Sequence, residues 1–256
     1  MRGKPWTREE LILTFNLYLK IPFGKISSRN SEVQALARLL GRTDNSIALR
    51  LTNFAACDPY LVQRGIKGMV GGLNQVIPIW NEFADNRDAL LFESERILAE
   101  MQYGSLEKKY PYIYKDLSNL QGESKIREVK TRVNQNVFRK IVLTNYNHQC
   151  ALSGIDVEEL LIASHIMPWS VNKEERLNPA NGICLSALYD KAFDQGLISF
   201  DMKYNLVLSK RLKKNVGKEY YNKYFGNIEG QQLRMPNKFL PEKRFLEWHL
   251  DCVFEK

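Results

Sequence analysis

One stretch, residues 150 to 200, constrains this chain more than any other: CALSGIDVEELLIASHIMPWSVNKEERLNPANGICLSALYDKAFDQGLISF. In this stretch His165 stands in a short apolar run, LLIASHI, and Pro168 follows closely after it. An Asn-Gly pair, Asn181 and Gly182, comes before a second apolar run, and such a pair is a turn signal. Two short apolar runs bounded by turn residues predict a ribbon of two strands.

A helix is predicted directly after this ribbon, over SALYDKAFD. Asp190 and Asp194 are four residues apart there, so they share one face of the helix. Carboxylate oxygens are the ligands that Mg²⁺ and Mn²⁺ prefer. A histidine, with an ordinary pKa of about 6.5, is largely neutral at pH 7 and can accept a proton from water. An activated water and a cation on the phosphate are what the hydrolysis of a phosphodiester requires.

The composition narrows the class of partner. The 256 residues suit one large or two modest domains, and the formal net charge is +8 with a pI near 9.2. Such a charge favours a polyanionic partner, either nucleic acid or an anionic membrane surface. No apolar run of about 18 residues is present, so we expect no membrane span. The first residues lack an apolar signal core, and we expect a cytoplasmic protein.

The cysteines indicate a reducing compartment. Cys57, Cys150, Cys184 and Cys252 are scattered, and no two of them form a C-x-x-C pair. This spacing argues against a disulfide framework and against a cysteine zinc site. We therefore expect no structural zinc.

Residues 6 to about 55 predict three helices. Thr7 and Glu10 form a capping box for the first helix, Ser31 can cap the second, and Asp44 can cap the third. Gly41 ends the second helix, and the spacing of helix, glycine turn and helix is that of a helix-turn-helix, whose second helix enters a major groove. A three-helix bundle that serves only to pack needs the same caps and turn. Both interpretations, DNA binding and packing, therefore stay open.

On the third helix, polar residues are available to contact DNA under the first interpretation. The candidates are Asn45, Arg50 and Asn53. Trp6 and Trp80 are better interpreted as packing residues.

A basic helix is predicted over residues 124–146. It carries Lys130, Arg132, Arg139 and Lys140, and we expect these side chains to clamp DNA phosphates, although a solvated face has the same composition. The predicted domains are a helical, DNA-binding domain over 1–105, a linker over 106–123, and a catalytic domain over 124–256. The fold class is α+β.

The ordered motifs resemble those of the HNH endonucleases, in their restriction-type branch. The resemblance spans about residues 130 to 208 and rests on CALSG, SHIMPWS, NPANG and DKAFDQGLI, which begin at residues 150, 164, 178 and 190. The family's ββα-metal fold would then form the C-terminal domain. NQNVFRKIVLTNY, just before the first motif, is also similar to the family.

By this resemblance, His165 is the general base and Asn181 positions its imidazole. Asp190 stands where many relatives carry the last histidine of the motif and takes the role of metal ligand. Asp194 is either a second ligand or a structural cap. The chain departs from the family at Ser164, where many relatives carry an acidic ligand.

The resemblance implies a metal-dependent endonuclease that hydrolyses double-stranded DNA in a restriction or defence system. It would use one Mg²⁺ or Mn²⁺ per active site. Because cutting both strands calls for two active sites, we expect a homodimer. Two alternatives are a DNA-binding protein with a decayed nuclease domain and a homing-type nuclease.

Overall fold

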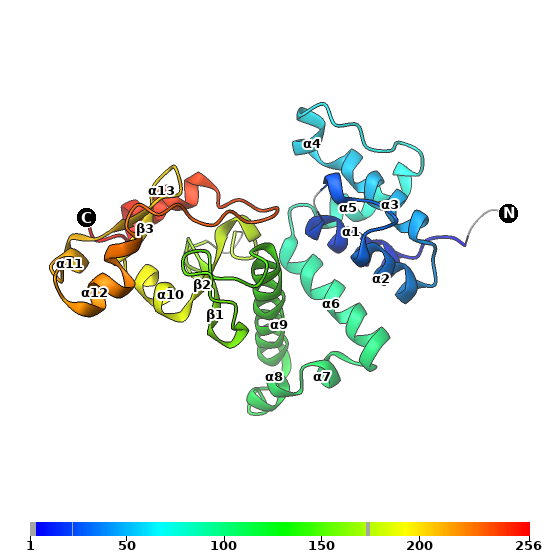
Figure 1. Cartoon of the computed structure of the whole chain (residues 1–256). Helices are drawn as coiled ribbons and strands as arrows, with labels where there is room; N and C mark the ends of the chain where they lie inside the picture. Colours follow the sequence, from blue (N-terminus) through cyan, green and yellow to red (C-terminus); the bar gives the residue numbers. More distant parts are fainter. Residues whose placement is uncertain (1–3, 22, 173–174) are drawn as a thin grey trace. The chain divides into compact units, whose positions relative to one another are not determined.

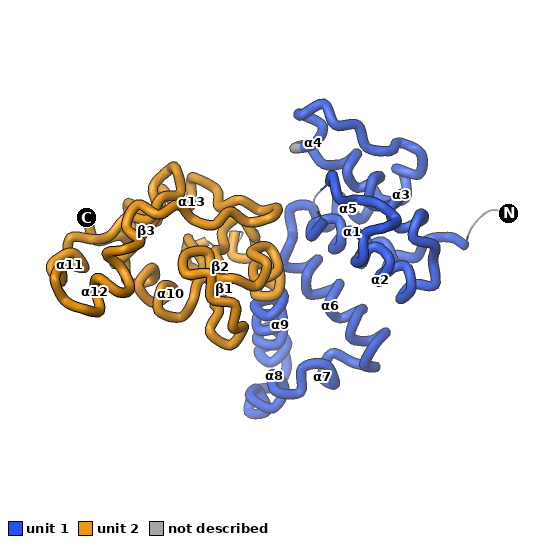
Figure 2. Tube along the Cα trace, in the orientation of Figure 1, with its two compact units in different colours: residues 1–137 blue, residues 138–256 orange. Residues whose placement is uncertain are grey.

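The computed structural model describes residues 4–21, 23–172 and 175–256, apart from the side chain of Tyr60. The chain forms two compact units, residues 1–137 and residues 138–256 (Figure 2). Both are rich in helix, and the described part of unit 2 also holds two small antiparallel sheets (Figure 1). Among the described residues, every helix is too short or too polar to cross a lipid bilayer.

Unit 1 is built from helices. They are α1 (Arg8–Lys20), α2 (Ser31–Leu40), α3 (Asp44–Cys57), α4 (Pro59–Gln63), α5 (Leu73–Phe83), α6 (Arg87–Tyr103), α7 (Leu106–Lys109) and α8 (Pro111–Asp116), with a short 3₁₀ turn, η1 (Phe23–Lys25). The long helix α9 (Gly122–Asn145) begins in unit 1 and ends in unit 2.

The three helices predicted for residues 6 to 55 are confirmed as α1, α2 and α3. The predicted capping box forms, since the Thr7 hydroxyl accepts from the Glu10 amide at 3.3 Å. The other two caps lie one residue earlier than predicted, at Asn30 for α2 and at Thr43 for α3. Both residues keep an extended backbone, so their side chains can turn back to the first free amides of the helix.

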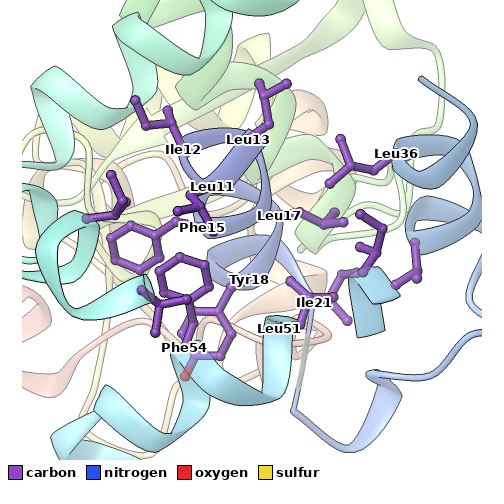
Figure 3. Packing of buried hydrophobic residues seen from close by; sticks show 14 of the residues in the cluster. Leu11, Ile12, Leu13, Phe15, Leu17, Tyr18, Ile21, Leu36, Leu51 and Phe54 are labelled. Atoms are coloured by element: carbon purple, nitrogen blue, oxygen red, sulfur yellow. The ribbon is translucent and has the colours of Figure 1, made fainter. Parts of the chain in front are cut away.

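The core of unit 1 is centred on α1, which packs against α2, α3, α5 and α6. Phe15 is fully buried and stacks on Phe54 of α3, with ring centroids 4.7 Å apart (Figure 3). Trp80 of α5 lies 5.2 Å from Phe15 and thus serves packing. Burying each such ring stabilises the fold by about 1.5–3 kcal/mol.

Unit 2 contains the strands. Its elements after α9 are η2 (Glu158–Leu160), β1 (Leu161–His165), η3 (Pro179–Asn181), β2 (Gly182–Ser186), α10 (Ala187–Asp194), β3 (Ile198–Phe200), β4 (Leu206–Leu208), α11 (Lys210–Lys213), α12 (Glu219–Tyr224), η4 (Gly226–Ile228) and α13 (Lys243–Cys252). β1 and β2 are antiparallel, with Leu161 opposite Ser186 and His165 opposite Gly182. The predicted ribbon followed by a helix is therefore confirmed.

The division between the units falls later than the predicted linker. Residues 106–123 hold α7, α8 and the start of α9. The first part of α9 packs within unit 1, where the buried Asn134 amide donates to the Asp88 carbonyl at 3.0 Å. A continuous helix gives no break in chain direction, so composition alone placed the boundary too early.

Gly182 lets α9 approach the ribbon closely. Its backbone is extended, with φ of −129°, so the Asn-Gly pair does not use the left-handed freedom of glycine. A Cβ atom here would lie 2.6 Å from Val142 Cγ2 and 2.9 Å from Phe138 Cζ. Any side chain at position 182 would therefore force Val142 and Phe138 to shift.

We expect Gly182→Ala to lower the free energy of unfolding by about 1–3 kcal/mol, because the added methyl group overpacks this contact. Urea denaturation of the two proteins measures the difference. Gly71→Ala is the matched control, since a Cβ at Gly71 meets nothing within 4 Å. Equal losses in the two variants would contradict this account.

Candidate active site

His165 is the last residue of β1, and its imidazole is held on several sides. Nε2 lies 2.8 Å from the carbonyl oxygen of Arg176. The ring stacks on Phe138 at 4.2 Å and meets the edge of Trp169 at 5.4 Å. Because a carbonyl only accepts, Nε2 carries the proton, and in the neutral ring the lone pair is on Nδ1.

The surroundings keep this ring neutral at pH 7. Burial lowers the pKa of His165, and the hydrogen bond to the Arg176 carbonyl raises it by less, so the pKa lies below its ordinary value. A neutral imidazole with its lone pair on a defined nitrogen is prepared to accept a proton.

Asn181 is fully buried and ties together the two ends of the segment between the strands. Its side-chain oxygen accepts from the Met167 amide at 2.8 Å. Its side-chain nitrogen donates to the carbonyls of Met167 at 3.0 Å and Glu175 at 3.3 Å. The Asn181 side chain therefore ties Met167, just after His165, to Glu175, just before Arg176.

Asp190 and Asp194 lie on α10, which packs against both β1 and β2. Burial raises the pKa of Asp190, while the Ser164 hydroxyl and the charge of Lys191 lower it by less. Burial and the charge of Asp190 raise the pKa of Asp194, although Asp194 is exposed at the surface. The two carboxylates are thus close enough to oppose each other's ionisation, as two anions sharing one site do.

Ser164 extends this cluster from β1. Its hydroxyl oxygen is buried and makes no hydrogen bond of standard geometry, yet it lies close enough to Asp190 to affect the pKa of that carboxyl. A buried polar atom without a hydrogen-bond partner costs folding free energy unless water or an ion binds to it.

These donors fit a hard divalent cation. Among the described residues, no group of three or more His, Cys, Asp and Glu side chains is arranged to hold a metal. Mg²⁺ is usually bound by one or two carboxylates, with waters and substrate phosphates supplying the other ligands. The pair Asp190 and Asp194, with the uncompensated Ser164 hydroxyl beside it, matches that requirement.

His165 and the two carboxylates lie on elements that pack against each other, since β1 carries His165 and α10 carries Asp190 and Asp194. Within residues 4–21, 23–172 and 175–256, no hydrogen bond or ion pair joins the His165 imidazole to Asp190 or Asp194. Ser164 and His165 are adjacent in the chain, which places their Cα atoms about 3.8 Å apart.

Two of the residues of α3 that were predicted to contact DNA form hydrogen bonds within unit 1 instead. Arg50 and Asn53 are both buried. The Arg50 guanidinium donates to Asn53 at 3.0 Å and to the Gly72 carbonyl at 3.1 Å, and the Asn53 amide donates to the Met69 carbonyl at 2.7 Å. These bonds hold the 69–72 segment on α3, so the placement does not support base contacts by Arg50 or Asn53. Asn45 is exposed at the start of the helix.

Two basic side chains of α9 within unit 1 form ion pairs with acidic residues. Lys130 lies 3.6 Å from Asp88, and Arg132 lies 3.0 Å from Asp116. Such partly exposed pairs contribute little to the free energy of unfolding.

Two predicted phosphate contacts lie on α9 within unit 2. Arg139 donates to the carbonyls of Leu161 at 2.5 Å and Glu158 at 2.9 Å, and so fixes the start of β1. Lys140 is exposed. Arg139 therefore has a structural role next to the ribbon, whereas Lys140 faces solvent.

Sequence reasoning missed two groups around His165. These are the Phe138 ring and the Arg176 carbonyl. Phe138 and Val142 are four residues apart on α9 and meet the same glycine, so an apolar stripe could have revealed Phe138. A backbone carbonyl has no sequence signal.

His249 packs behind α10 and has a structural role. Its ring stacks on Phe193 at 3.7 Å, Nε2 lies 3.1 Å from the Phe193 carbonyl, and Nδ1 lies 2.9 Å from the Ser199 hydroxyl. Burial lowers the pKa of His249 to about 4, and the bond to the Phe193 carbonyl opposes this only in part.

The pKa of His249 predicts an acid-sensitive fold. An unfolded chain protonates this histidine near pH 6.5, but the folded protein keeps it neutral down to about pH 4. The free energy of unfolding is therefore expected to fall by about 3 kcal/mol as the pH decreases from about 6.5 to about 4. Urea denaturation across this window measures the slope, which His249→Gln should reduce and His148→Gln should not. An unchanged slope in His249→Gln would contradict the assignment.

Comparison with known proteins identifies the motif. Residues 150–201 match a family model described as HNH endonuclease. A search of the curated proteins finds no match to this chain. The matched residues contain β1, β2 and α10, and with them the histidine, the asparagine and both aspartates described above. Residues 150–201 of unit 2 are thus similar to an HNH endonuclease domain, and this similarity suggests nuclease activity.

Proposed function

We propose that this protein is a metal-dependent endonuclease that hydrolyses phosphodiester bonds of double-stranded DNA, in a restriction or defence system. The observation that carries the proposal is the His165 imidazole, whose Nε2–H is bound to the Arg176 carbonyl. Its Nδ1 is left as the proton acceptor, and β1, which carries His165, packs against α10, which carries the carboxylate pair.

In this mechanism, His165 Nδ1 removes a proton from water as the water attacks phosphorus in line with the leaving oxygen. The Arg176 carbonyl then stabilises the imidazolium through the Nε2–H bond, and Phe138 keeps the ring oriented. A positioned base of this kind accelerates a reaction by about 10² to 10⁴-fold. The products would carry 5′-phosphates.

Asp190 would hold the divalent cation, Mg²⁺ or Mn²⁺, with Asp194 as its partner. When bound, the cation would neutralise the developing charge on the phosphate and on the leaving 3′ oxygen. One cation per active site suits a donor set of two carboxylates and a hydroxyl. The raised pKa of Asp190 means that the cation would compete with a proton for that carboxylate.

DNA contacts are proposed for exposed or partly exposed cationic and polar side chains. In unit 1 they are Asn45 of α3 with Lys130 and Arg132 of α9; in unit 2, Lys140 belongs to the same group. A further basic surface covers α11 and α12, where Lys210, Lys214 and Lys223 are exposed. Phosphate contacts of this kind make binding weaken steeply with salt.

A second candidate is a DNA-binding protein whose nuclease domain has lost activity. It is favoured by the small donor set, since the described residues offer no group of three or more His, Cys, Asp and Glu side chains for a metal. Ser164 stands where an acidic ligand would complete such a group. A homing-type nuclease would share the chemistry proposed above and differ only in its biological setting.

Cleavage of plasmid DNA by the wild-type protein separates these candidates. Methylated and unmethylated supercoiled plasmids are incubated with Mg²⁺, Mn²⁺ or EDTA, and DNA binding is measured in parallel at several salt concentrations. Cutting that depends on the metal supports the endonuclease. Binding without cutting under every condition would favour the inactive DNA-binding protein. Conversion directly to linear DNA, with a dimer in sedimentation, would support paired active sites.

A further inference from the structure

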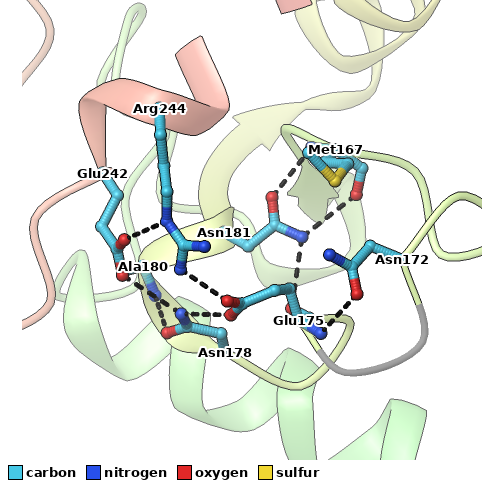
Figure 4. A network of polar contacts seen from close by, with 8 residues as sticks. All are labelled: Met167, Asn172, Glu175, Asn178, Ala180, Asn181, Glu242 and Arg244. Atoms are coloured by element: carbon cyan, nitrogen blue, oxygen red, sulfur yellow. Dashed lines mark hydrogen bonds and ion pairs between the residues drawn. The ribbon is translucent and has the colours of Figure 1, made fainter. Parts of the chain in front are cut away.

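A polar network joins α13 to the segment that supplies the Arg176 carbonyl. Arg244, at the start of α13, binds two carboxylates at once (Figure 4). Its Nη2 lies 2.5 Å from Glu175, and its Nε lies 2.6 Å from Glu242. Because Glu175 directly precedes Arg176, the network reaches the residue whose carbonyl binds the imidazole.

The second side of the network is formed by Asn178. Its amide donates to Glu175 at 2.8 Å and to Glu242 at 3.2 Å. Its side-chain oxygen accepts from the Ala180 amide at 3.1 Å, and the Ala180 carbonyl accepts from the Glu242 amide at 3.1 Å. Glu175 is thus held from both sides, by a cation and by an amide.

These bonds determine where the Arg176 carbonyl lies. The Glu175 side chain is fixed by Arg244 and Asn178, and the Glu175 carbonyl accepts from Asn181 at 3.3 Å. The next carbonyl along the chain, that of Arg176, accepts from His165 Nε2 at 2.8 Å. A shift of Glu175 would therefore move the acceptor that selects the tautomer of His165.

We propose that Arg244 is a positioning residue for His165: through Glu175, it holds the Arg176 carbonyl on Nε2 and so keeps the lone pair on Nδ1. Arg244 is 79 residues from His165 in the sequence and makes no contact with substrate in this role. The inference rests on the proposed function of His165 as general base, but the tautomer it predicts can be measured without any cleavage.

The expected effect is on geometry more than on stability. The Arg244 side chain is 55% exposed and that of Glu175 is 21% exposed. Partly exposed ion pairs contribute little to the free energy of unfolding. A displaced acceptor, in contrast, allows the neutral ring to carry its proton on Nδ1, and in that tautomer Nδ1 cannot accept a proton from water.

Nitrogen NMR of the imidazoles tests the tautomer directly. The chain contains three histidines, so the ring signals can be assigned with single His→Ala variants. In the wild type we expect His165 to carry its proton on Nε2 alone. In Arg244→Met we expect a mixture of both tautomers for His165, with the signals of His249 unchanged. Arg244→Lys should restore part of the wild-type pattern, because it keeps a cation near Glu175.

Arg211→Met is the matched control, because it removes another arginine ion pair of unit 2, 2.9 Å from Glu255. It should leave the His165 signals unchanged. In cleavage assays, Arg244→Met is expected to lower kcat by up to about 100-fold, the effect of a misplaced catalytic group, with unchanged affinity for DNA.

The outcomes are distinguishable. If Arg244→Met keeps the wild-type tautomer of His165, the positioning role is overturned, whether or not the protein cuts DNA. If the His249 signals change as well, Arg244 supports the fold in general, and the specific role is again overturned; Glu175→Gln then provides a milder variant for the same measurement. If the wild type shows the expected tautomer but never cuts DNA, the proposed nuclease function fails while the positioning of the imidazole stands.

Discussion

His165→Ala is expected to lower the rate of DNA cleavage by about 10² to 10⁴-fold, the usual contribution of a general base. Affinity for DNA should not change, because the imidazole is held by Phe138 and by the Arg176 carbonyl within the protein. Single-turnover cleavage of a labelled duplex, with binding measured in EDTA, separates the two quantities.

The control for this variant is His148→Ala. His148 is exposed, and its nearest acidic partner is Glu158 at 3.5 Å, so its removal should leave cleavage unchanged. Added imidazole should restore part of the activity of His165→Ala, because the variant leaves a space beside the Phe138 ring. Full activity in His165→Ala would show that another group takes the proton from water.

Asp190→Ala is expected to abolish metal-dependent cleavage. A metal that polarises a phosphate contributes several kcal/mol to the transition state, which corresponds to a loss of more than about 100-fold. Calorimetric titration with Mn²⁺ in the absence of DNA should show weakened binding. Asp190→His should retain activity, because the HNH motif that these residues resemble implies a histidine ligand at this place.

The control for Asp190 is Asp251→Asn, which changes an exposed carboxylate of the same unit that pairs with Lys256 at 2.9 Å. It should affect neither metal binding nor cleavage. If Asp190→Ala binds Mn²⁺ as the wild type does, the cation is held elsewhere. Removing Asp190 should also bring the pKa of Asp194 closer to its ordinary value, since the charge of Asp190 is one cause of the increase.

The sequence alone determined the ribbon, the helix after it and the order of the HNH motifs. Apolar runs, turn residues and the four-residue spacing of Asp190 and Asp194 are local features, so they can be interpreted without knowledge of the fold. The same holds for α1, α2 and α3, because their apolar faces and capping residues lie within or directly before each helix, although two caps lie one residue earlier than predicted. For these elements, neighbouring residues supply most of the information.

Only the tertiary structure decided what the polar residues contact. Arg50 and Asn53 suit a DNA surface by residue type, but they bind the 69–72 segment of their own unit. Likewise Arg139 binds backbone carbonyls. A cationic side chain can satisfy an internal carbonyl as readily as a phosphate, and sequence does not show which of the two is near.

The tertiary structure also decided how the His165 imidazole is held. The Arg176 carbonyl, the Phe138 ring and the Arg244 ion pair come from three separate parts of unit 2. The motif predicted His165, but its tautomer depends on a backbone acceptor that every residue type possesses. Sequence determined which residues could do chemistry here, because reactivity belongs to side-chain type; the fold decided their protonation and orientation, because those depend on atoms distant in the chain.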